Sequence, residues 1–196
     1  MSEFVNAWHK AGWVIQDPQT VIRDGLVHVC QNRIETVKAT QSIGPDPVID
    51  HGPGVLMPAL VNAHTHLELG ALRGKIPNSV GFVAWVRHLI EKRAQLDTSA
   101  LLKGVEVSIN ELIQSGCGIA AEVATLGVSA QPFFSSALNG IWFKEYIGNN
   151  TPDINPVVDA KTRSIAGHAP HTTAPDLLVR LKGITRKNQT AFTIHL

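Results

Sequence analysis

Hydrophobic and polar positions follow two different patterns along the chain, and the change comes near residue 57. Residues 11–56 contain short runs rich in Val, Ile, Trp and Thr, which are separated by turn residues such as Asp24-Gly25. Runs of this kind are typical of short β-strands. We therefore predict a small β-sandwich module over residues 1–56, incomplete in this chain.

From residue 57 onward, short apolar runs alternate with segments in which apolar residues recur at helical spacing. The spacing predicts helices over 80–94, 99–115, 155–163 and 174–186. We expect Thr98 or Ser99 to cap the second helix, Gly116 to end it, and Thr173 to cap the last one. The apolar runs predict strands at 59–64, 117–124, 141–148, 164–169 and 190–196. Strands that alternate with helices are typical of a parallel sheet.

The segment after the first of these strands decides between two kinds of parallel sheet. An open, doubly wound sheet usually has a glycine-rich phosphate loop there, whereas this chain has HTHLELG at 64–70. Barrels of βα units place their functional residues at the carboxyl ends of the strands. We therefore predict an α/β fold in which residues 57–196 form about five strands of a partial (β/α)8 TIM-like barrel.

His64-Thr65-His66 is the sharpest chemical feature, because side chains two positions apart on a strand point the same way. Two imidazoles at the mouth of a barrel can hold one metal ion; the alternative is two unrelated polar residues at a strand end. His195 lies near the end of the last predicted strand, and taken alone it suits a structural role. On a parallel strand of the same barrel it becomes a third ligand, and three protein nitrogens plus a water form a known catalytic zinc arrangement.

Other polar residues are expected on the same face of the barrel. His168 and His171 follow the fourth barrel strand, where they orient substrate or transfer protons, or lie as ordinary surface histidines in a loop. Glu68 follows the two histidines of the first strand, and it either contacts substrate or pairs with Arg73. Glu122 and Glu145 lie within the predicted barrel strands. They either support the site from behind its ligands or form structural ion pairs, and we favour the ion pairs.

Composition excludes several classes of protein. The formal net charge is +1 and no run of Lys or Arg occurs, so nothing favours nucleic-acid binding. No apolar run reaches the ~18 residues of a membrane span, and the N-terminus lacks the apolar core of a signal peptide. Cys30 and Cys117 lie far apart and form no CxxC pair. We therefore expect a cytoplasmic protein with reduced thiols and with no membrane or nucleic-acid partner.

Four segments resemble the amidohydrolase superfamily, in its deaminase and chlorohydrolase branch. VLMPALVNAHTHLELGALRG (55–74) resembles the segment that opens the barrel, and GFVAWVRHLIEKR (81–93) resembles the helix that follows. GHAPHTTAPDLL (167–178) is similar to the HAPYTxSxxLL segment of adenosine-type and aminofutalosine-type deaminases. FTIHL (192–196) resembles the fifth-strand metal segment, so the resemblance covers nearly the whole chain.

The resemblance implies a role for each matching residue. It implies three metal ligands, which are His64, His66 and His195. His168 matches a histidine that contacts the substrate, and Glu68 is expected to help to hold it. His171 stands where these deaminases usually have tyrosine, so its contact with substrate departs from the family pattern. Zn²⁺ is the expected divalent ion, although Fe²⁺, Mn²⁺ and Ni²⁺ bind similar ligands.

The activity implied by the resemblance is hydrolysis of C–N bonds. The expected reaction is hydrolytic deamination of an amino-purine-like or related small heterocycle, in which hydroxide supplied at the metal attacks the ring carbon that bears the amino group. Triazine-type chlorohydrolysis, or another cyclic amidohydrolase reaction, is the alternative, because the same metal site serves all of them.

Length separates this chain from a complete barrel of that family. A whole (β/α)8 barrel needs about 250 residues, whereas the chain has 196. The resemblance places the catalytic Glu and Asp beyond residue 196, so no catalytic residue is assigned within the chain. Five strands would leave two unpaired edges. We therefore expect the chain alone to be inactive and to pair as a homodimer or with a complementing C-terminal half; a non-catalytic fragment is the alternative.

Overall fold

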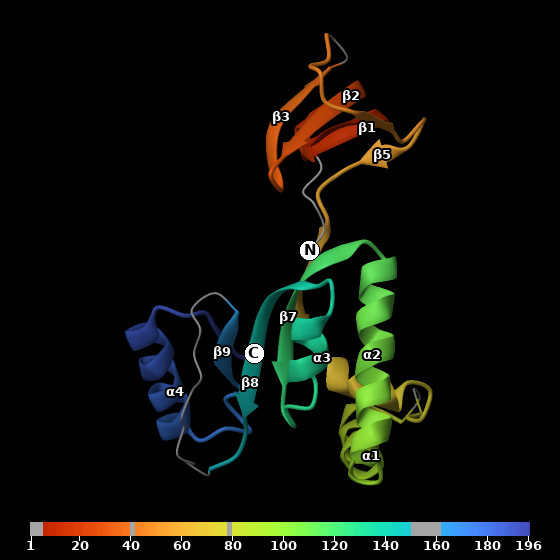
Figure 1. The fold of residues 1–196 in the computed structure, drawn as a ribbon. Coiled ribbons are helices and arrows are strands. Elements are labelled where there is room, and N and C mark those ends of the chain that lie inside the picture. The colour runs from red at the N-terminus through yellow and green to blue at the C-terminus, as the bar shows by residue number, and fades with distance from the viewer. Residues whose placement is uncertain (1–5, 40–41, 78–79, 150–161) are drawn as a thin grey trace. The chain divides into compact units, whose positions relative to one another are not determined.

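The computed structural model describes residues 6–39, 42–77, 80–149 and 162–196. The chain divides into two compact units, Met1–Pro58 and Ala59–Leu196, whose helices and strands are labelled in Figure 1. The helix predicted over 155–163 lies outside the described residues except for its last two positions, and Arg163 begins a strand. No helix in the described part of the chain is long and apolar enough to cross a membrane.

The first unit contains a five-stranded mixed sheet, as its short apolar runs predict. The strands follow the order β3-β2-β1-β4, and β5 also pairs with β1. β1, β2 and β3 are antiparallel, whereas β4 and β5 run parallel to β1. Ala11, Val14 and Val27 form the centre of its core. The strands are β1 Ala7–Asp17, β2 Thr20–Cys30, β3 Arg33–Ala39, β4 Val48–Asp50 and β5 Val55–Leu56.

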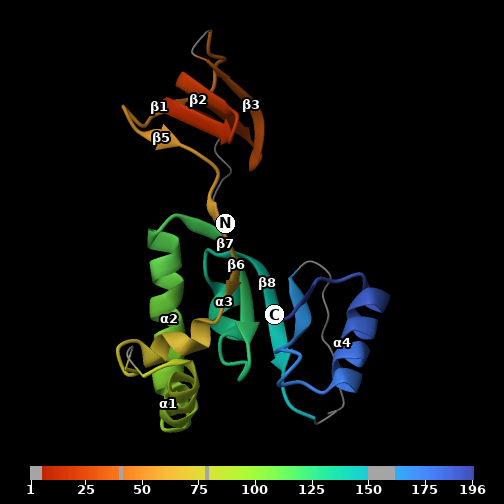
Figure 2. The same ribbon diagram turned by 180° about the vertical axis from the view of Figure 1, so that it is seen from behind.

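The second unit is a curled sheet of five parallel strands in the order β10-β9-β8-β7-β6, so the strands follow one another in sequence across the sheet (Figures 1 and 2). They are β6 Leu60–Thr65, β7 Cys117–Ala124, β8 Asn139–Tyr146, β9 Arg163–Gly167 and β10 Phe192–Thr193. The helices between them are η1 Leu67–Leu72, α1 Phe82–Ala94, α2 Thr98–Gln114, α3 Ala130–Ser135 and α4 Pro175–Asn188. All five strands and the three described helices predicted for this region are present; the short η1 and α3 were not predicted.

The two faces of this sheet have different surroundings, because side chains alternate along each strand. Ala124 and Trp142 belong to a buried cluster that also contains residues of α2 and α3. A separate cluster on the other, inner face contains Val123, Phe143 and Ala166. Glu145 and His168 lie two residues beyond Phe143 and Ala166, so their side chains are expected to point to the same inner face.

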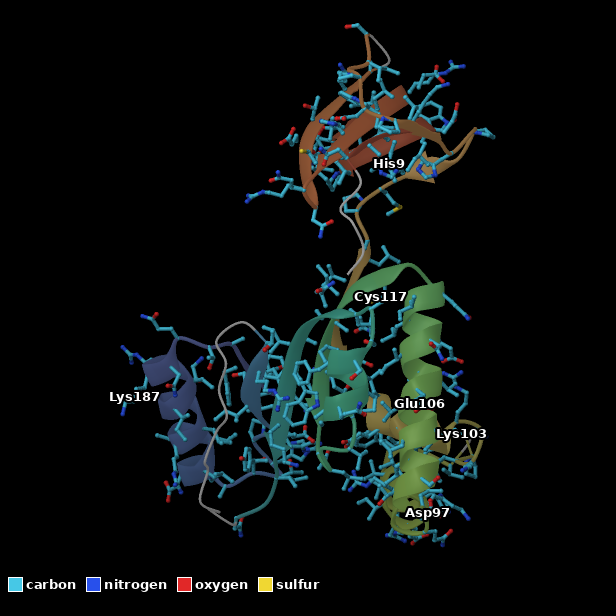
Figure 3. All side chains as sticks on the ribbon, in the orientation of Figure 1. His9, Asp97, Lys103, Glu106, Cys117 and Lys187 are labelled. Atoms are coloured by element: carbon cyan, nitrogen blue, oxygen red, sulfur yellow. The ribbon has the colours of Figure 1, made fainter. Side chains whose placement is uncertain are left out.

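A carboxylate caps α2 where a hydroxyl was expected. Asp97 is the N-cap residue, and its Oδ1 accepts a hydrogen bond of 2.8 Å from the backbone N–H of Ala100 (Figure 3). The prediction of Thr98 or Ser99 was therefore wrong by one or two residues, because Asp caps a helix as well as Ser or Thr does. Gly116 follows the helix with φ +84°, the left-handed conformation that commonly ends helices, as predicted.

The start of α4 also differs from the prediction. Ala174 is the N-cap residue and makes no side-chain cap, while Pro175 occupies the first turn. Thr173 does not cap the helix; its hydroxyl donates to the backbone oxygen of Tyr146 at 3.4 Å. This contact ties the start of α4 to the end of β8, next to the edge where the polar residues gather.

Candidate metal centre

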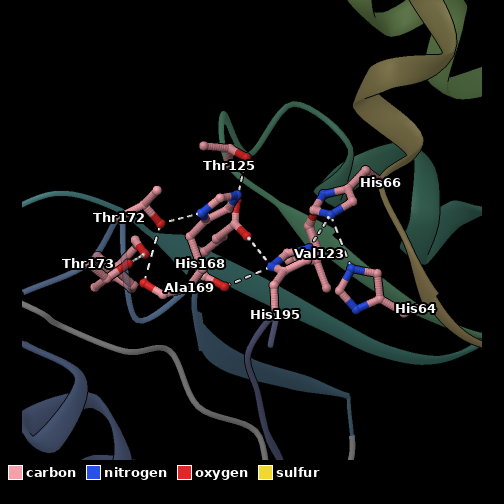
Figure 4. A network of polar contacts seen from close by, with 11 residues as sticks. His64, His66, Val123, Thr125, His168, Ala169, Thr172, Thr173 and His195 are labelled. Carbon is pink, nitrogen blue, oxygen red and sulfur yellow. Dashed lines mark hydrogen bonds and ion pairs between the residues drawn. The ribbon is translucent and has the colours of Figure 1, made fainter. Parts of the chain in front are cut away.

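Three histidines from the two outermost strands of the curled sheet converge on one point (Figure 4). His64 lies on β6, His66 directly follows it, and His195 follows β10. The Nε2 atom of His66 lies 3.1 Å from Nε2 of His64 and 3.1 Å from Nε2 of His195. The curl of the sheet therefore brings together residues 129 positions apart in sequence.

Backbone carbonyls determine which nitrogen of two of these rings carries the proton. His66 Nδ1 lies 2.8 Å from the carbonyl oxygen of Val123, and His195 Nδ1 lies 2.8 Å from that of His168. A carbonyl oxygen only accepts hydrogen bonds, so each Nδ1 is a donor and each Nε2 of a neutral ring presents its lone pair. Two lone pairs 3.1 Å apart repel each other unless a cation lies between or beside them. The donor set therefore fits a divalent metal ion.

Burial favours the neutral form of these rings, which is the form that binds metal. Removal of water lowers the pKa of His64 and of His66, and the charge of a protonated His195 nearby lowers both pKa values further. The Glu145 carboxylate acts in the opposite direction on both pKa values. Burial likewise lowers the pKa of His168. These directions favour neutral rings at His64, His66 and His168, and one acidic group raises the pKa of all three.

Glu145 is that acidic group. Its side chain is 1% exposed, and its Oε2 accepts a hydrogen bond of 2.6 Å from the hydroxyl of Thr125. Its Oε1 lies 3.7 Å from Nδ1 of His195 and makes no hydrogen bond within the described residues. The interpretation of Glu145 as an ion-paired carboxylate therefore holds only where His195 is protonated, and the group that it faces is one of the three converging histidines.

Glu122 has no such ionic partner. It is fully buried, and its Oε2 accepts a hydrogen bond of 2.8 Å from the backbone N–H of Leu67. Burial raises the pKa of Glu122 to about 7, and the nearby Glu68 and Glu145 contribute in the same direction. Across the part of the chain that the structure describes, no cationic side chain forms an ion pair with it. The favoured interpretation of Glu122 as an ion-paired residue was therefore wrong.

Glu68 holds the loop between β7 and α3. Its carboxylate is buried and accepts backbone N–H groups of Leu126 at 2.8 Å, Gly127 at 2.6 Å and Ser129 at 3.4 Å. The alternative in which Glu68 pairs with Arg73 was wrong, because Arg73 forms its ion pair with Glu111. In this structure both oxygens of Glu68 are thus used within the chain.

The other two residues predicted to bind substrate differ in position. His168 lies beside His195, with ring centroids 4.8 Å apart, and its Nδ1 contacts the hydroxyl of Thr172 at 2.5 Å (Figure 4). His171 is exposed in the turn that precedes α4. The structure therefore brings His168 to the converging histidines, whereas His171 lies on the surface. Sequence reasoning did not identify the carbonyls of Val123 and His168 as determinants of the site, because every residue has a carbonyl.

No protein-family model matches the chain, but individual proteins do. An aminodeoxyfutalosine deaminase from a Nitratiruptor species is 27% identical over 142 residues, which cover 70% of this chain and 35% of that protein. A 5'-deoxyadenosine deaminase from Methanosarcina mazei is 25% identical over 193 residues, which cover 89% of this chain and 44% of that protein.

Solved structures give the fold. An adenosine deaminase from Xanthomonas campestris with bound zinc superposes with a TM-score of 0.83 and 20% identity, over 97% of this chain and 49% of that one. The chain thus spans half or less of the length of the proteins that it matches. This likeness confirms the predicted partial barrel. By sequence the chain is similar to these two deaminases, and its fold is similar to half of the adenosine deaminase, in agreement with the resemblance of its four segments.

Proposed function

We propose that this chain supplies the histidine ligands of a metal-dependent hydrolase that removes the amino group from an amino-purine-like or related heterocycle. The observation that carries the proposal is the convergence of the Nε2 atoms of His64, His66 and His195 within hydrogen-bonding distance of one another. The sequence relatives support the choice of substrate class, because they are named as deaminases of aminodeoxyfutalosine and 5'-deoxyadenosine.

Zn²⁺ is the ion that we propose for this site. Three imidazole nitrogens with a remaining open position form a known catalytic zinc arrangement, and one structural neighbour contains bound zinc. A divalent ion held there would lower the pKa of a water molecule and supply hydroxide near neutral pH. Fe²⁺, Mn²⁺ and Ni²⁺ bind similar ligands, so the metal content of the isolated protein decides among them.

The remaining residues act on the ligands and on the substrate. The backbone carbonyls of Val123 and His168 orient the two rings whose Nδ1–H groups they accept. We propose His168 as a substrate contact, because Thr172 holds its Nδ1 and its ring lies beside His195. Substrate contacts of Glu68 and His171 stay predictions. Triazine-type chlorohydrolysis remains the alternative reaction, because a structure named as a triazine hydrolase has a similar fold, with a TM-score of 0.84 at 14% identity.

Metal binding by the chain tests the proposal without requiring turnover. Purified metal-free protein is titrated with Zn²⁺ against a competing chelator, and we expect one tightly bound ion. The His64→Ala/His66→Ala double variant, which leaves His195 alone, should lose at least about 100-fold in affinity. Circular dichroism of the two metal-free proteins checks that both are folded. A wild-type chain that binds no zinc, or a double variant that binds it equally well, would refute the proposed site.

A second experiment addresses the reaction. The form of the protein that its source cells produce is isolated, its metals are measured, and ammonia release is followed with 5'-deoxyadenosine and related adenine nucleosides. We expect turnover that stops when the metal is removed and returns when zinc is added. Release of chloride from a chlorotriazine, with no ammonia from any adenine nucleoside, would favour the alternative reaction.

A further inference from the structure

Two buried carboxylates of the curled sheet each have one oxygen without a hydrogen bond in the described residues, Glu122 and Glu145, and that of Glu145 lies on the inner face. Its side chain is almost completely buried, yet one of its two oxygens makes no hydrogen bond within the described residues. A buried carboxylate oxygen without a donor is costly, because it has lost its water and gained no partner. A residue with this cost calls for an explanation in terms of the groups that it faces.

The position of Glu145 on β8 aims it at the histidines. Phe143 lies two residues earlier and belongs to the inner cluster with Val123 and Ala166. Since side chains alternate along a strand, Glu145 points to the same inner face. There its free Oε1 lies 3.7 Å from Nδ1 of His195, and its other oxygen is held by the hydroxyl of Thr125.

Glu145 is also the acidic residue that acts on several rings of the site together. Its charge raises the pKa of His64, His66 and His168, against the larger effect of burial on each of them. Its counterpart Glu122, equally buried on the neighbouring strand β7, points to the opposite face with Ala124, and its Oε2 accepts the backbone N–H of Leu67 instead of facing a histidine ring. The charge of Glu145 is therefore directed at the histidine cluster.

Glu145 could bind a metal ion itself, or it could act on the ion indirectly by orienting the ligand His195. Glu145, His168 and His195 have ligand atoms within 4.8 Å of one another, so they form a second group that could hold a cation. The nitrogen of His195 that faces Glu145 is Nδ1, and it donates its hydrogen to the carbonyl of His168 at 2.8 Å. That nitrogen has no lone pair to offer, which favours an action of Glu145 through His195 rather than on an ion.

We propose that Glu145 is a positioning residue of the three-histidine site: its buried carboxylate faces Nδ1–H of His195, keeps Nε2 of that ring directed at His66, and supplies negative charge that strengthens binding of a divalent cation. The inference rests on the metal site of the proposed function. Carboxylates that face the outer nitrogen of a ligating histidine commonly orient the ring and make it a better donor. Here the carboxylate shares that task with the carbonyl of His168.

The Glu145→Gln variant tests this proposal, because it removes the charge and keeps the size and the acceptor for Thr125. Zinc affinity of the metal-free chain is measured against a competing chelator, together with the number of ions bound. We expect about 10–100-fold weaker binding than in the wild type, with one ion bound in both proteins. Glu145→Asp, which retains the charge on a shorter side chain, should recover part of the loss.

Glu122→Gln is the matched control. It removes a carboxylate that is as deeply buried as that of Glu145 but does not face His195. We expect its zinc affinity to stay within about threefold of the wild type, because glutamine keeps the oxygen that accepts the backbone N–H of Leu67 and no ring of the three histidines loses a contact. Thermal unfolding of the metal-free variants separates loss of affinity from loss of fold. Two-dimensional NMR of the ring nitrogens of His195 supplies a further readout, because the resonance of Nδ1, which faces the carboxylate, should shift in Glu145→Gln and not in Glu122→Gln.

The outcomes distinguish this inference from the proposed function. If the wild type binds no zinc, the metal site itself fails. If the wild type binds zinc and Glu145→Gln binds it equally well, only the role of Glu145 is overturned. If the wild type binds two ions and Glu145→Gln binds one, Glu145 is a ligand and not a positioning residue. Should Glu145→Gln fail to fold, the affinity of Glu145→Asp decides, and an unchanged value would overturn the inference.

Discussion

Each unit of the molecule contains a close pair of histidines, and the two pairs differ in what surrounds them. His9 and His51 of the first unit are joined by a contact of 3.0 Å between Nδ1 and Nε2. His66 and His195 of the second unit lie 3.1 Å apart through Nε2 of both rings. In the first pair either ring can place a proton between the two nitrogens. In the second pair both protons are already used at Nδ1 by backbone carbonyls.

The comparison teaches that distance between histidines does not by itself indicate a metal site. His9 lies on β1 near the surface (Figure 3), and its pair is exposed. A neutral hydrogen bond, with water around it, satisfies that pair completely. The second pair has two lone pairs facing each other, which fits a bound cation, and the buried Glu145 faces one of its rings. The hydrogen bonds of the outer nitrogens therefore distinguish the two pairs better than their separation does.

The largest effect on stability is expected at Glu68, the buried anion that holds the loop between β7 and α3. Glu68→Ala leaves backbone N–H groups of Leu126 and Gly127 without an acceptor and should cost about 3–5 kcal/mol of unfolding free energy. Asp50→Ala, the matched change beside His51, removes an exposed ion pair with Lys10 and an exposed acceptor of the Gly52 N–H, and it should lower the unfolding free energy far less because water replaces both contacts. Urea unfolding of both variants measures the difference. Equal costs would show that buried anchors do not distinguish the two regions.

Much of this second region could be predicted from the sequence, and the reason is its regularity. The apolar runs located all five parallel strands, and the spacing of two placed His64 and His66 on one side. His195 as a third ligand depended on the resemblance, because a single histidine near a strand end has no periodic signal. Glu68 could not be assigned, since the backbone N–H groups that it accepts leave no mark in the sequence.

A smaller, pH-dependent effect is expected at Glu122. Its pKa is raised from 4.5 to about 7 by burial, so the folded chain binds a proton more tightly than the unfolded chain does. The contribution to stability is complete below pH 4.5 and is lost as the pH rises through about 7. Glu122→Gln removes this dependence and should be more stable than the wild type by about 2–3 kcal/mol at pH 8, relative to their difference at pH 4.

Unfolding by urea at the two pH values measures this difference directly. The depressed pKa values of His64 and His66 make stability fall toward acid pH, but they are present in both proteins and cancel in the comparison. A wild type and variant whose stabilities run parallel between pH 4 and pH 8 would show that the pKa of Glu122 is the same in the folded and the unfolded chain, so that Glu122 is ionised in the folded chain at neutral pH. In that case Glu122, like Glu145, would be a buried charge near the histidines.

The smallest effect on zinc affinity is expected from the exposed pair His9 and His51. Removing this pair tests the comparison most directly. His9→Ala/His51→Ala removes two histidines as close together as those of the site, but we expect zinc affinity to change by less than about twofold. These rings belong to the other compact unit and contact each other through Nδ1 of His9 and Nε2 of His51. One of these nitrogens can therefore donate to the other, unlike the two Nε2 atoms of His66 and His195. Zinc titration against a chelator, beside His64→Ala/His66→Ala, measures the contrast. If the exposed pair proved to bind zinc as tightly as the inner histidines, then hydrogen bonding at Nδ1 would not be what makes a histidine cluster a metal site.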